Sequence, residues 1–109
     1  MRRIFSIGIS SLFAALLVVG CQALQSGAPP VTPAMVRIGA IGGMSAATLA
    51  AGRELLATRC TVCHSLEPVA KYSPAQWQTN VQRMSGRTKL NEEETRQITA
   101  YLVAARESL

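Results

Sequence analysis

The chain has 109 residues and a formal net charge of +5, from 11 basic and 6 acidic residues. Two of the basic residues, Arg2 and Arg3, precede an apolar N-terminal run; without them nine basic residues remain against six acidic ones, a net charge of +3. No nucleic-acid-binding motif accompanies these charges, which argues against nucleic acid as a partner. The chain has three cysteines and one histidine, so any metal or thiol chemistry depends on few side chains.

The N-terminus predicts a secretory signal over residues 1–20. A Met-Arg-Arg start precedes the apolar run Ile4–Gly20, which is the pattern of such signals. The run ends in Val-Val-Gly before Cys21, and this resembles a bacterial lipobox, whose cysteine is lipidated after cleavage. The alternatives are an ordinary signal with an incidental cysteine and an uncleaved anchor, since the run approaches the length that spans a bilayer. Gln22 follows in place of Asp, so the resemblance implies anchoring to the outer membrane, facing the periplasm.

Residues 21–45 predict a flexible tether. The segment is rich in Ala, Gly, Pro and Ser, a composition that cannot bury a core. Its few apolar residues, among them Met35 and Ile38, would allow at most one short turn against a folded domain. We therefore expect the folded domain to cover residues 46–109 and to stand off the membrane on this tether.

Residues 60–64 read Cys-Thr-Val-Cys-His, the attachment pattern of c-type haem. Two intervening residues make about one helical turn, which turns both sulfurs to one edge of the porphyrin. Cys60 and Cys63 would form the thioether bonds to haem c, and His64 would bind the iron as proximal ligand. Because the chain has no second histidine, bis-histidine ligation within one chain is excluded.

Two other kinds of site also use a Cys-x-x-Cys pair. A redox dithiol would need a βαβ context, and no alternating strand pattern flanks the pair. A structural zinc site would need four protein ligands, whereas Cys60, Cys63 and His64 supply three. Lipidation of Cys21 and two haem thioethers account for all three cysteines, so no disulfide is expected.

Three helices are expected in the all-α domain. The first covers about Ala46 to Arg59, with apolar residues at helical spacing on one face. The second starts after Ser73 as N-cap, with a capping-box Gln three residues later, and stops near Gly86. The third starts at Asn91 and carries three glutamates in its first turn, where they favour the positive end of the helix dipole.

At this point the chain resembles the class I cytochrome c family, over about Leu49 to Leu102. In that family a glycine eight residues before the first haem cysteine and a large apolar residue four before it lie on the N-terminal helix. Gly52 and Leu56 hold these places, and the run Ile98-Thr99-Ala100-Tyr101-Leu102 matches the C-terminal helix that they cross. The resemblance implies a small cytochrome c-like three-helix domain around one covalent haem. The family's proline beside the proximal histidine has only a loose match in Pro68.

Met84 is the candidate distal iron ligand, as in short bacterial c-type domains that the Trp77, Val81 and Met84 stripe resembles. The alternative is that Met84 is ordinary core packing. Met35 and Met44 precede the haem motif and are less suitable. Trp77 is expected to contact the haem, by packing or by donating its indole N–H to a propionate, or else to serve as a hydrophobic anchor.

The sequence thus predicts a membrane-tethered monohaem cytochrome c that carries single electrons between periplasmic or membrane redox partners. It is not expected to be an enzyme itself, although it would suit the electron-entry subunit of an oxidoreductase. The alternative is a five-coordinate haem protein that binds a small gas or peroxide at an open distal site. Some basic residues near the haem segments would pair with propionates or steer an acidic partner, if they are not simply a solvated face: Arg59, Lys71, Arg83, Arg87 and Lys89.

Overall fold

The computed structural model describes residues 27–61 and 65–109. The predicted signal, Cys21, Cys63 and His64 lie outside these residues. The described chain forms helices and no strand, which confirms the all-α class for this part. In chain order the elements are α2 (Pro33–Ile41), α3 (Ala46–Arg59), the short 3-10 helix η1 (Val69–Lys71), α4 (Pro74–Ser85) and α5 (Glu92–Glu107).

The three predicted helices form where their caps place them. The Ser73 hydroxyl accepts the main-chain N–H of Gln76 at 3.1 Å, and the Gln76 side chain accepts the N–H of Ser73 at 2.9 Å. Asn91 and Glu94 make the same reciprocal pair at the start of α5, at 2.8 and 3.0 Å. Each pair satisfies two main-chain donors that a helix end leaves free.

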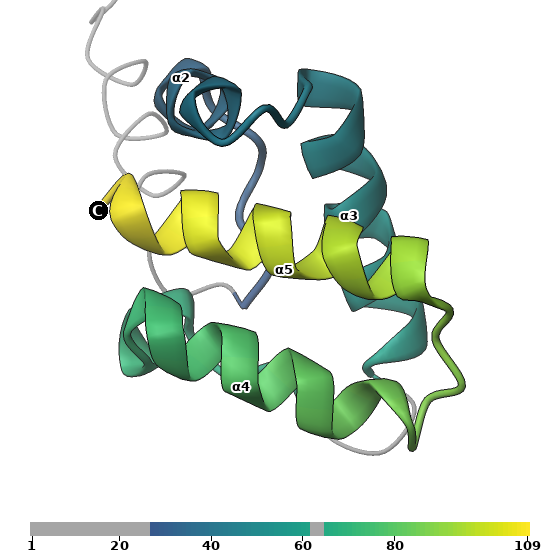
Figure 1. The fold of residues 1–109 in the computed structure, drawn as a ribbon. Coiled ribbons are helices and arrows are strands. Elements are labelled where there is room, and N and C mark those ends of the chain that lie inside the picture. The colour runs from purple at the N-terminus through teal and green to yellow at the C-terminus, as the bar shows by residue number, and fades with distance from the viewer. Residues whose placement is uncertain (1–26, 62–64) are drawn as a thin grey trace, which may run out of the picture.

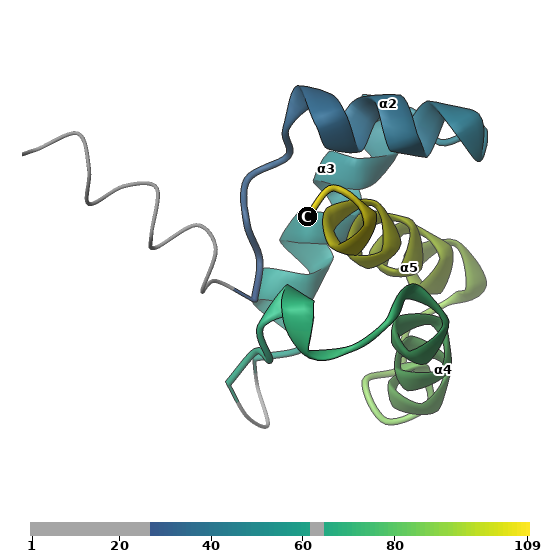
Figure 2. The same ribbon diagram turned by 90° about the vertical axis from the view of Figure 1, so that its left-hand side faces the viewer.

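Helix α5 is the centre of the fold. It lies between α2 and α4, and α3 crosses behind it (Figures 1 and 2). Its inner face is almost fully buried, with Tyr101 at 0%, and Ile98 and Leu102 at 1% exposure. Leu49 and Leu56 of α3 and Val81 of α4 face the same core. One apolar core therefore connects all the described helices.

The predicted crossing of α3 and α5 at Gly52 is confirmed. A β-carbon placed on Gly52 would meet the carbonyl oxygen of Gln97 and would lie 2.9 Å from the β-carbon of Tyr101. These are main-chain and helix-proximal atoms, which cannot swing aside as a flexible side chain would. Only glycine allows the two helices this approach.

The predicted tether is wrong for its second half. Thr32 caps α2, its hydroxyl accepting the N–H of Met35 at 3.2 Å, and Pro33 occupies the first turn. The side chain of Met35 is 1% exposed in the main core, and Gly39 packs on Leu49. Composition suggested a linker, yet a few apolar residues on one face of α2 suffice because a core already exists for them to cover.

The residues before α2 also pack on the domain. Gly27 lies against Leu66, and the carbonyl oxygens of Ala28 and Pro29 accept Arg53 Nε, each at 3.1 Å. Pro29 also accepts the hydroxyl of Tyr101. We call residues 27–31 the strap. It runs from the start of α2 down to the segment that follows residue 64 (Figure 2).

Candidate functional site

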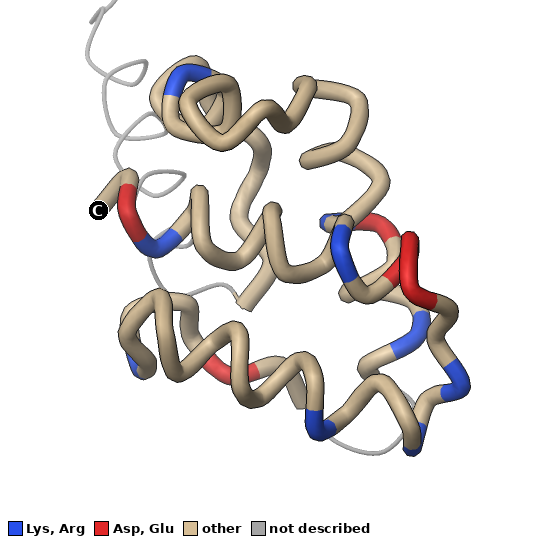
Figure 3. Tube along the Cα trace, in the orientation of Figure 1, with Lys and Arg blue, Asp and Glu red and all other residues tan. Residues whose placement is uncertain are grey.

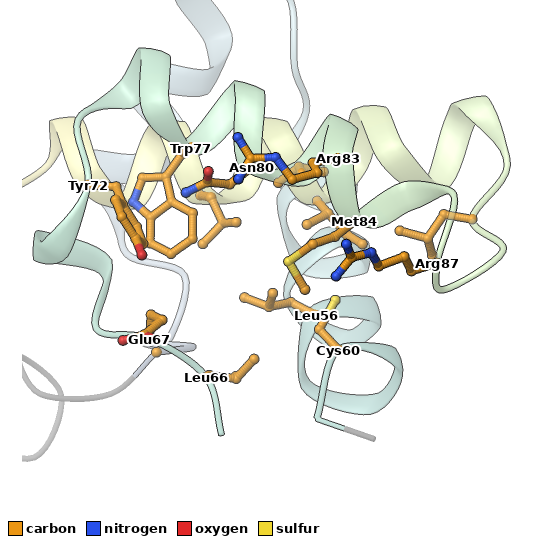
Figure 4. A pocket seen from close by; sticks show the side chains of 15 residues that line it. Leu56, Cys60, Leu66, Glu67, Tyr72, Trp77, Asn80, Arg83, Met84 and Arg87 are labelled. Atoms are coloured by element: carbon orange, nitrogen blue, oxygen red, sulfur yellow. The ribbon is translucent and has the colours of Figure 1, made fainter. Parts of the chain in front are cut away.

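A cavity of about 280 Å³ opens between the end of α3, the helices α4 and α5, and the segments that flank η1 (Figure 4). This volume is just below the range of roughly 300–1,000 Å³ for small-molecule sites. Its wall is mainly apolar, and the cavity is partly open to solvent. The aliphatic residues that line it are Leu56, Leu66, Val81, Leu90, Ile98 and Leu102.

Cys60 forms one end of this cavity. It terminates α3 as the C-cap, where its N–H donates to the carbonyl of Leu56 at 3.2 Å, and it is 6% exposed. Burial raises the pKa of its thiol, an effect that the neighbouring charge of Arg59 partly opposes. The helix that the sequence predicted before the haem motif thus delivers the first cysteine of that motif into the apolar wall.

Met84 reaches the same cavity from α4. Its sulfur and that of Cys60 both face the cavity in Figure 4, and both residues line it. The other described methionines lie elsewhere: Met35 is in the core, and the Met44 sulfur contacts Arg96 Nη1 at 3.1 Å. Sequence reasoning selected Met84 over these two, and among the described methionines it alone lines this cavity.

Trp77 lines the cavity with its ring, but its indole N–H is already used. It donates to the carbonyl oxygen of Val69 at 2.9 Å inside the fold. The indole N–H is therefore not free to donate to a haem propionate, which was one of its two predicted haem contacts. Tyr72 packs edge-on against Trp77, with ring centroids 5.0 Å apart and an interplanar angle of 85°. The two rings fix η1 against α4 at the cavity wall.

Pro68 does not line the cavity. Its carbonyl oxygen accepts the N–H of Lys71 at 3.0 Å and closes η1. The predicted contact between Pro68 and His64 involves a residue outside the described part of the chain. It remains a prediction.

Two arginines on α4 and in the turn after it border the cavity without a partner. Arg83 and Arg87 line it together with Asn80, and within residues 27–61 and 65–109 neither guanidinium has a hydrogen bond or ion pair. In contrast, Arg59 Nη1 lies 3.7 Å from Glu94, and Lys71 Nζ lies 2.9 Å from Glu67. Arg83 and Arg87 therefore offer free donors to a bound anion.

Asn80, Leu66 and Leu90 were not singled out from the sequence. Asn80 falls three residues after Trp77 and four before Met84 on α4, so it shares a helix face with the predicted stripe. This spacing would have identified it. Leu66 and Leu90 lie in connecting segments, where no periodicity indicates which side chains turn inward.

A broader hollow of about 920 Å³ lies along α5 between α2 and α4. Its lining is mixed and includes Gln78, Gln82 and Glu107. It holds no cysteine, and its one methionine, Met44, is the one in contact with Arg96. We therefore place the candidate site at the smaller cavity, beside the haem motif.

The described residues hold neither a metal-binding cluster nor a single membrane-spanning helix. Residues 27–61 and 65–109 contain no group of three or more His, Cys, Asp and Glu side chains placed to hold a metal ion. In the same residues no single helix is long and apolar enough to cross a bilayer; α2 and α3 together have that length and composition but meet at 110°.

Comparisons of the chain with protein-family models, with curated proteins and with solved structures found no match.

Proposed function

We propose that the chain is a membrane-tethered monohaem cytochrome c that carries one electron at a time between redox proteins. The observation that supports it most is the meeting of Cys60 and Met84 at one apolar cavity. Cys60 opens the Cys-x-x-Cys-His motif, and Met84 is a soft thioether 24 positions further along the chain. Two residues that the sequence assigned to one haem site thus line the same cavity.

The residues at the cavity fit a haem. The aliphatic wall suits the apolar faces of a porphyrin, and the unpaired guanidinium groups of Arg83 and Arg87 suit its carboxylates. Cys60 and Cys63 would hold the group covalently, His64 would be the proximal ligand and Met84 the distal one. Bound there, the haem supplies an iron that changes oxidation state by one electron.

The protein's own contribution is to hold and tune the group. Leu56, Ile98 and Leu102 keep water from one side of the cavity, and a drier surrounding raises the reduction potential. A methionine ligand favours ferrous iron in the same direction. If His64 and Met84 both bound the iron, a substrate would have no open position there, so the proposed role is that of a carrier and not of an enzyme.

Replacing Met84 with leucine tests the distal ligand. Leucine keeps the volume close to that of methionine and removes the sulfur. We expect the Met84→Leu chain to keep its covalent haem, to lose the sulfur–iron charge-transfer band of the oxidised form, and to bind carbon monoxide when reduced. Met44→Leu is the matched control, because that sulfur contacts Arg96 and not the cavity, and it should leave both spectra unchanged.

The same spectra distinguish the alternative. If the unaltered chain already lacks the band and takes up carbon monoxide, Met84 is core packing and the chain is a five-coordinate haem protein. If a denaturing gel shows no covalent haem, neither function holds.

A further inference from the structure

The strap forms part of the wall of the candidate site. Gly27 lines the cavity, and so do Leu66 and Glu67, which follow the haem motif. A β-carbon placed on Gly27 would meet the β-carbon of Leu66 and would lie 2.7 Å from the carbonyl oxygen of Glu67. The two segments therefore pack closely at one edge of the cavity, which we call the cavity mouth. Figure 2 shows the strap running down to this place from the start of α2.

The strap braces the segment that follows the haem motif at the end nearest the motif. Further along this segment, the carbonyl oxygens of Val69 and Tyr72 accept hydrogen bonds from side chains of α4 and α5, at 2.9 and 3.0 Å. Closer to the motif, the strap packs on Leu66 and Glu67. The strap and the two helices thus hold this stretch of the cavity wall from both ends.

The sequence of the strap suits a rigid wall. It reads Gly-Ala-Pro-Pro-Val and carries no charged residue (Figure 3). Each proline fixes its own φ, and the residue before a proline is restricted to extended backbone. Such a segment loses little conformational entropy when it packs on the domain. Because prolines have no N–H, the strap is held through its carbonyl oxygens.

Arg53 holds the strap from the surface of α3. Its Nε lies 3.1 Å from the carbonyl oxygens of both Ala28 and Pro29. Tyr101 donates its hydroxyl to Pro29 from α5, but this tyrosine is fully buried and also packs at the helix crossing. Arg53 is exposed, so it can be replaced without disturbing the core. It is therefore the residue through which the strap can be released selectively.

We propose that the strap is a fixed wall of the haem site and that Arg53 is the positioning residue that holds it in place. The proposal rests on the proposed function. With the strap in place, Gly27 and Leu66 cover one edge of the cavity, and a released strap would admit water there. Water beside the haem lowers its reduction potential. Arg53 does not itself line the cavity, so its effect on the iron would pass through the strap.

Two variants of the full, haem-loaded chain release the strap in different ways. Arg53→Leu removes the donors, and Arg53→Lys restores a donor and the charge on a flexible stem. Gly27→Ala forces the strap away from the segment after the haem motif without a change of charge. One control is Arg37→Leu, which removes an exposed arginine of α2. The other is Gly42→Ala, where the new β-carbon makes only an ordinary contact at 3.6 Å.

The first measurement reports the position of the strap and does not involve the redox state. A protease of broad specificity should cut Arg53→Leu and Gly27→Ala between residues 27 and 32 faster than it cuts the unaltered chain. The expected increase is about fivefold, the factor that corresponds to loss of one hydrogen bond of typical net strength. Fragment masses locate the cut. Arg53→Lys and both controls should be cut at the unaltered rate.

The second measurement is the reduction potential. It is made at 1 M ionic strength, where exposed charges are screened beyond a Debye length of about 3 Å, so that the lost charge of Arg53 contributes little. The potential should fall in Arg53→Leu and in Gly27→Ala. Arg53→Lys and both controls should keep the potential of the unaltered chain.

The outcomes separate the two proposals. Absence of covalent haem on a denaturing gel contradicts both. If haem is present and the strap is cut faster in both variants at an unchanged potential, the strap only stabilises the fold and the proposal for Arg53 is wrong. It is also wrong if neither variant is cut faster. If Arg53→Leu lowers the potential and Gly27→Ala does not, the loss of charge accounts for the shift and the proposal is again wrong.

Discussion

Tyr101 of α5 donates its hydroxyl hydrogen to the main-chain carbonyl of Pro29, 72 residues earlier in the chain. The β-carbon of the same tyrosine packs on Gly52, where α3 crosses α5. One buried side chain thus fixes both the helix crossing and the strap that leads to the cavity mouth.

Tyr101→Phe should destabilise the fold by about 1 kcal/mol at neutral pH, the typical net value of one hydrogen bond. The difference should depend on pH. Burial raises the pKa of Tyr101 to about 12, above the ordinary value of 10.0, with the charge of Arg53 opposing it. A raised folded-state pKa gives stability that is complete below pH 10 and is lost as the pH rises through about 12.

The measurement is the thermal midpoint of both chains between pH 7 and pH 12.5. At pH 7 the unaltered protein should have the higher thermal midpoint, and the difference from Tyr101→Phe should shrink above pH 10. Tyr72→Phe, which removes a half-buried phenol, is the control for the loss of one titrating tyrosine. If the difference in thermal midpoint stays constant to pH 12.5, Tyr101 does not ionise within the fold.

Gly52→Ala should destabilise the domain by about 2 kcal/mol, because the new methyl meets main-chain atoms of α5 and the helices must separate. Alanine's better helix propensity, worth up to about 1 kcal/mol, offsets only part of this cost. Gly86→Ala is the matched control. A β-carbon there meets nothing within 4 Å, and the residue already has helical φ of −66°.

Urea denaturation of the two variants checks this prediction. The urea midpoint of Gly86→Ala should equal or slightly exceed that of the unaltered chain, and the midpoint of Gly52→Ala should lie at a lower urea concentration. Equal midpoints for both variants would mean that the crossing relaxes without cost.

The helix crossing at Gly52 is an example of a structural feature that could be predicted from the sequence. Local signals were sufficient where one short pattern determines the result: the caps at Ser73 and Asn91, and the small residue at a close crossing. They failed for α2, since the nine residues of this helix are stable only against a core made by other parts of the chain. Propensity and composition describe a segment alone, whereas the burial of Met35 depends on α5.

The site was predictable to a similar degree. Cys60 and Met84 could be named because their residue types carry chemistry, and the structure brings both to one cavity. The partner of the Trp77 indole could not be named, because Val69 lies in η1, a helix of three residues that is too short to show a periodic pattern. Nor could the strap be foreseen, since its bonds join carbonyl oxygens, which every residue has, to side chains distant in sequence.

If the chain holds the proposed haem, its haem-free form should be markedly less stable than the loaded one. Without the group, the aliphatic wall formed by Leu56, Ile98 and Leu102 faces a cavity of about 280 Å³ that is partly open to water. The remaining domain of about 80 residues has a small core, and domains of this size are marginal without a staple. The Cys60→Ala/Cys63→Ala chain should therefore melt at lower temperature and bind a hydrophobic dye.

Calorimetry of the loaded and the double-alanine chains makes the comparison. Ala57→Ser, an exposed change on α3, is the control for altering that helix. A haem-free chain that melts at the same temperature would show that the described core suffices.

In the proposed haem-loaded chain, removing the positive charge of Arg83 or Arg87 beside the cavity should lower the reduction potential. A nearby positive charge favours the ferrous state, which carries one positive charge fewer than the ferric state. At about 10 Å in a solvent-like dielectric, one unit charge contributes about 0.4 kcal/mol, which is on the order of 20 mV for a one-electron couple. Arg87→Gln should shift the potential down by about that amount, and Arg83→Gln should act in the same direction.

Redox titration at low and high salt gives the measurement, with Arg37→Gln on α2 as the control, since that residue does not line the cavity. The shift should shrink at high salt, because exposed charges are screened beyond a Debye length of about 3 Å at 1 M ionic strength. A larger shift that survives high salt would indicate direct pairing of the guanidinium with a haem carboxylate, because such a pair excludes salt. If haem is present and neither variant shifts the reduction potential, both guanidinium groups lie too far from the iron to act on it.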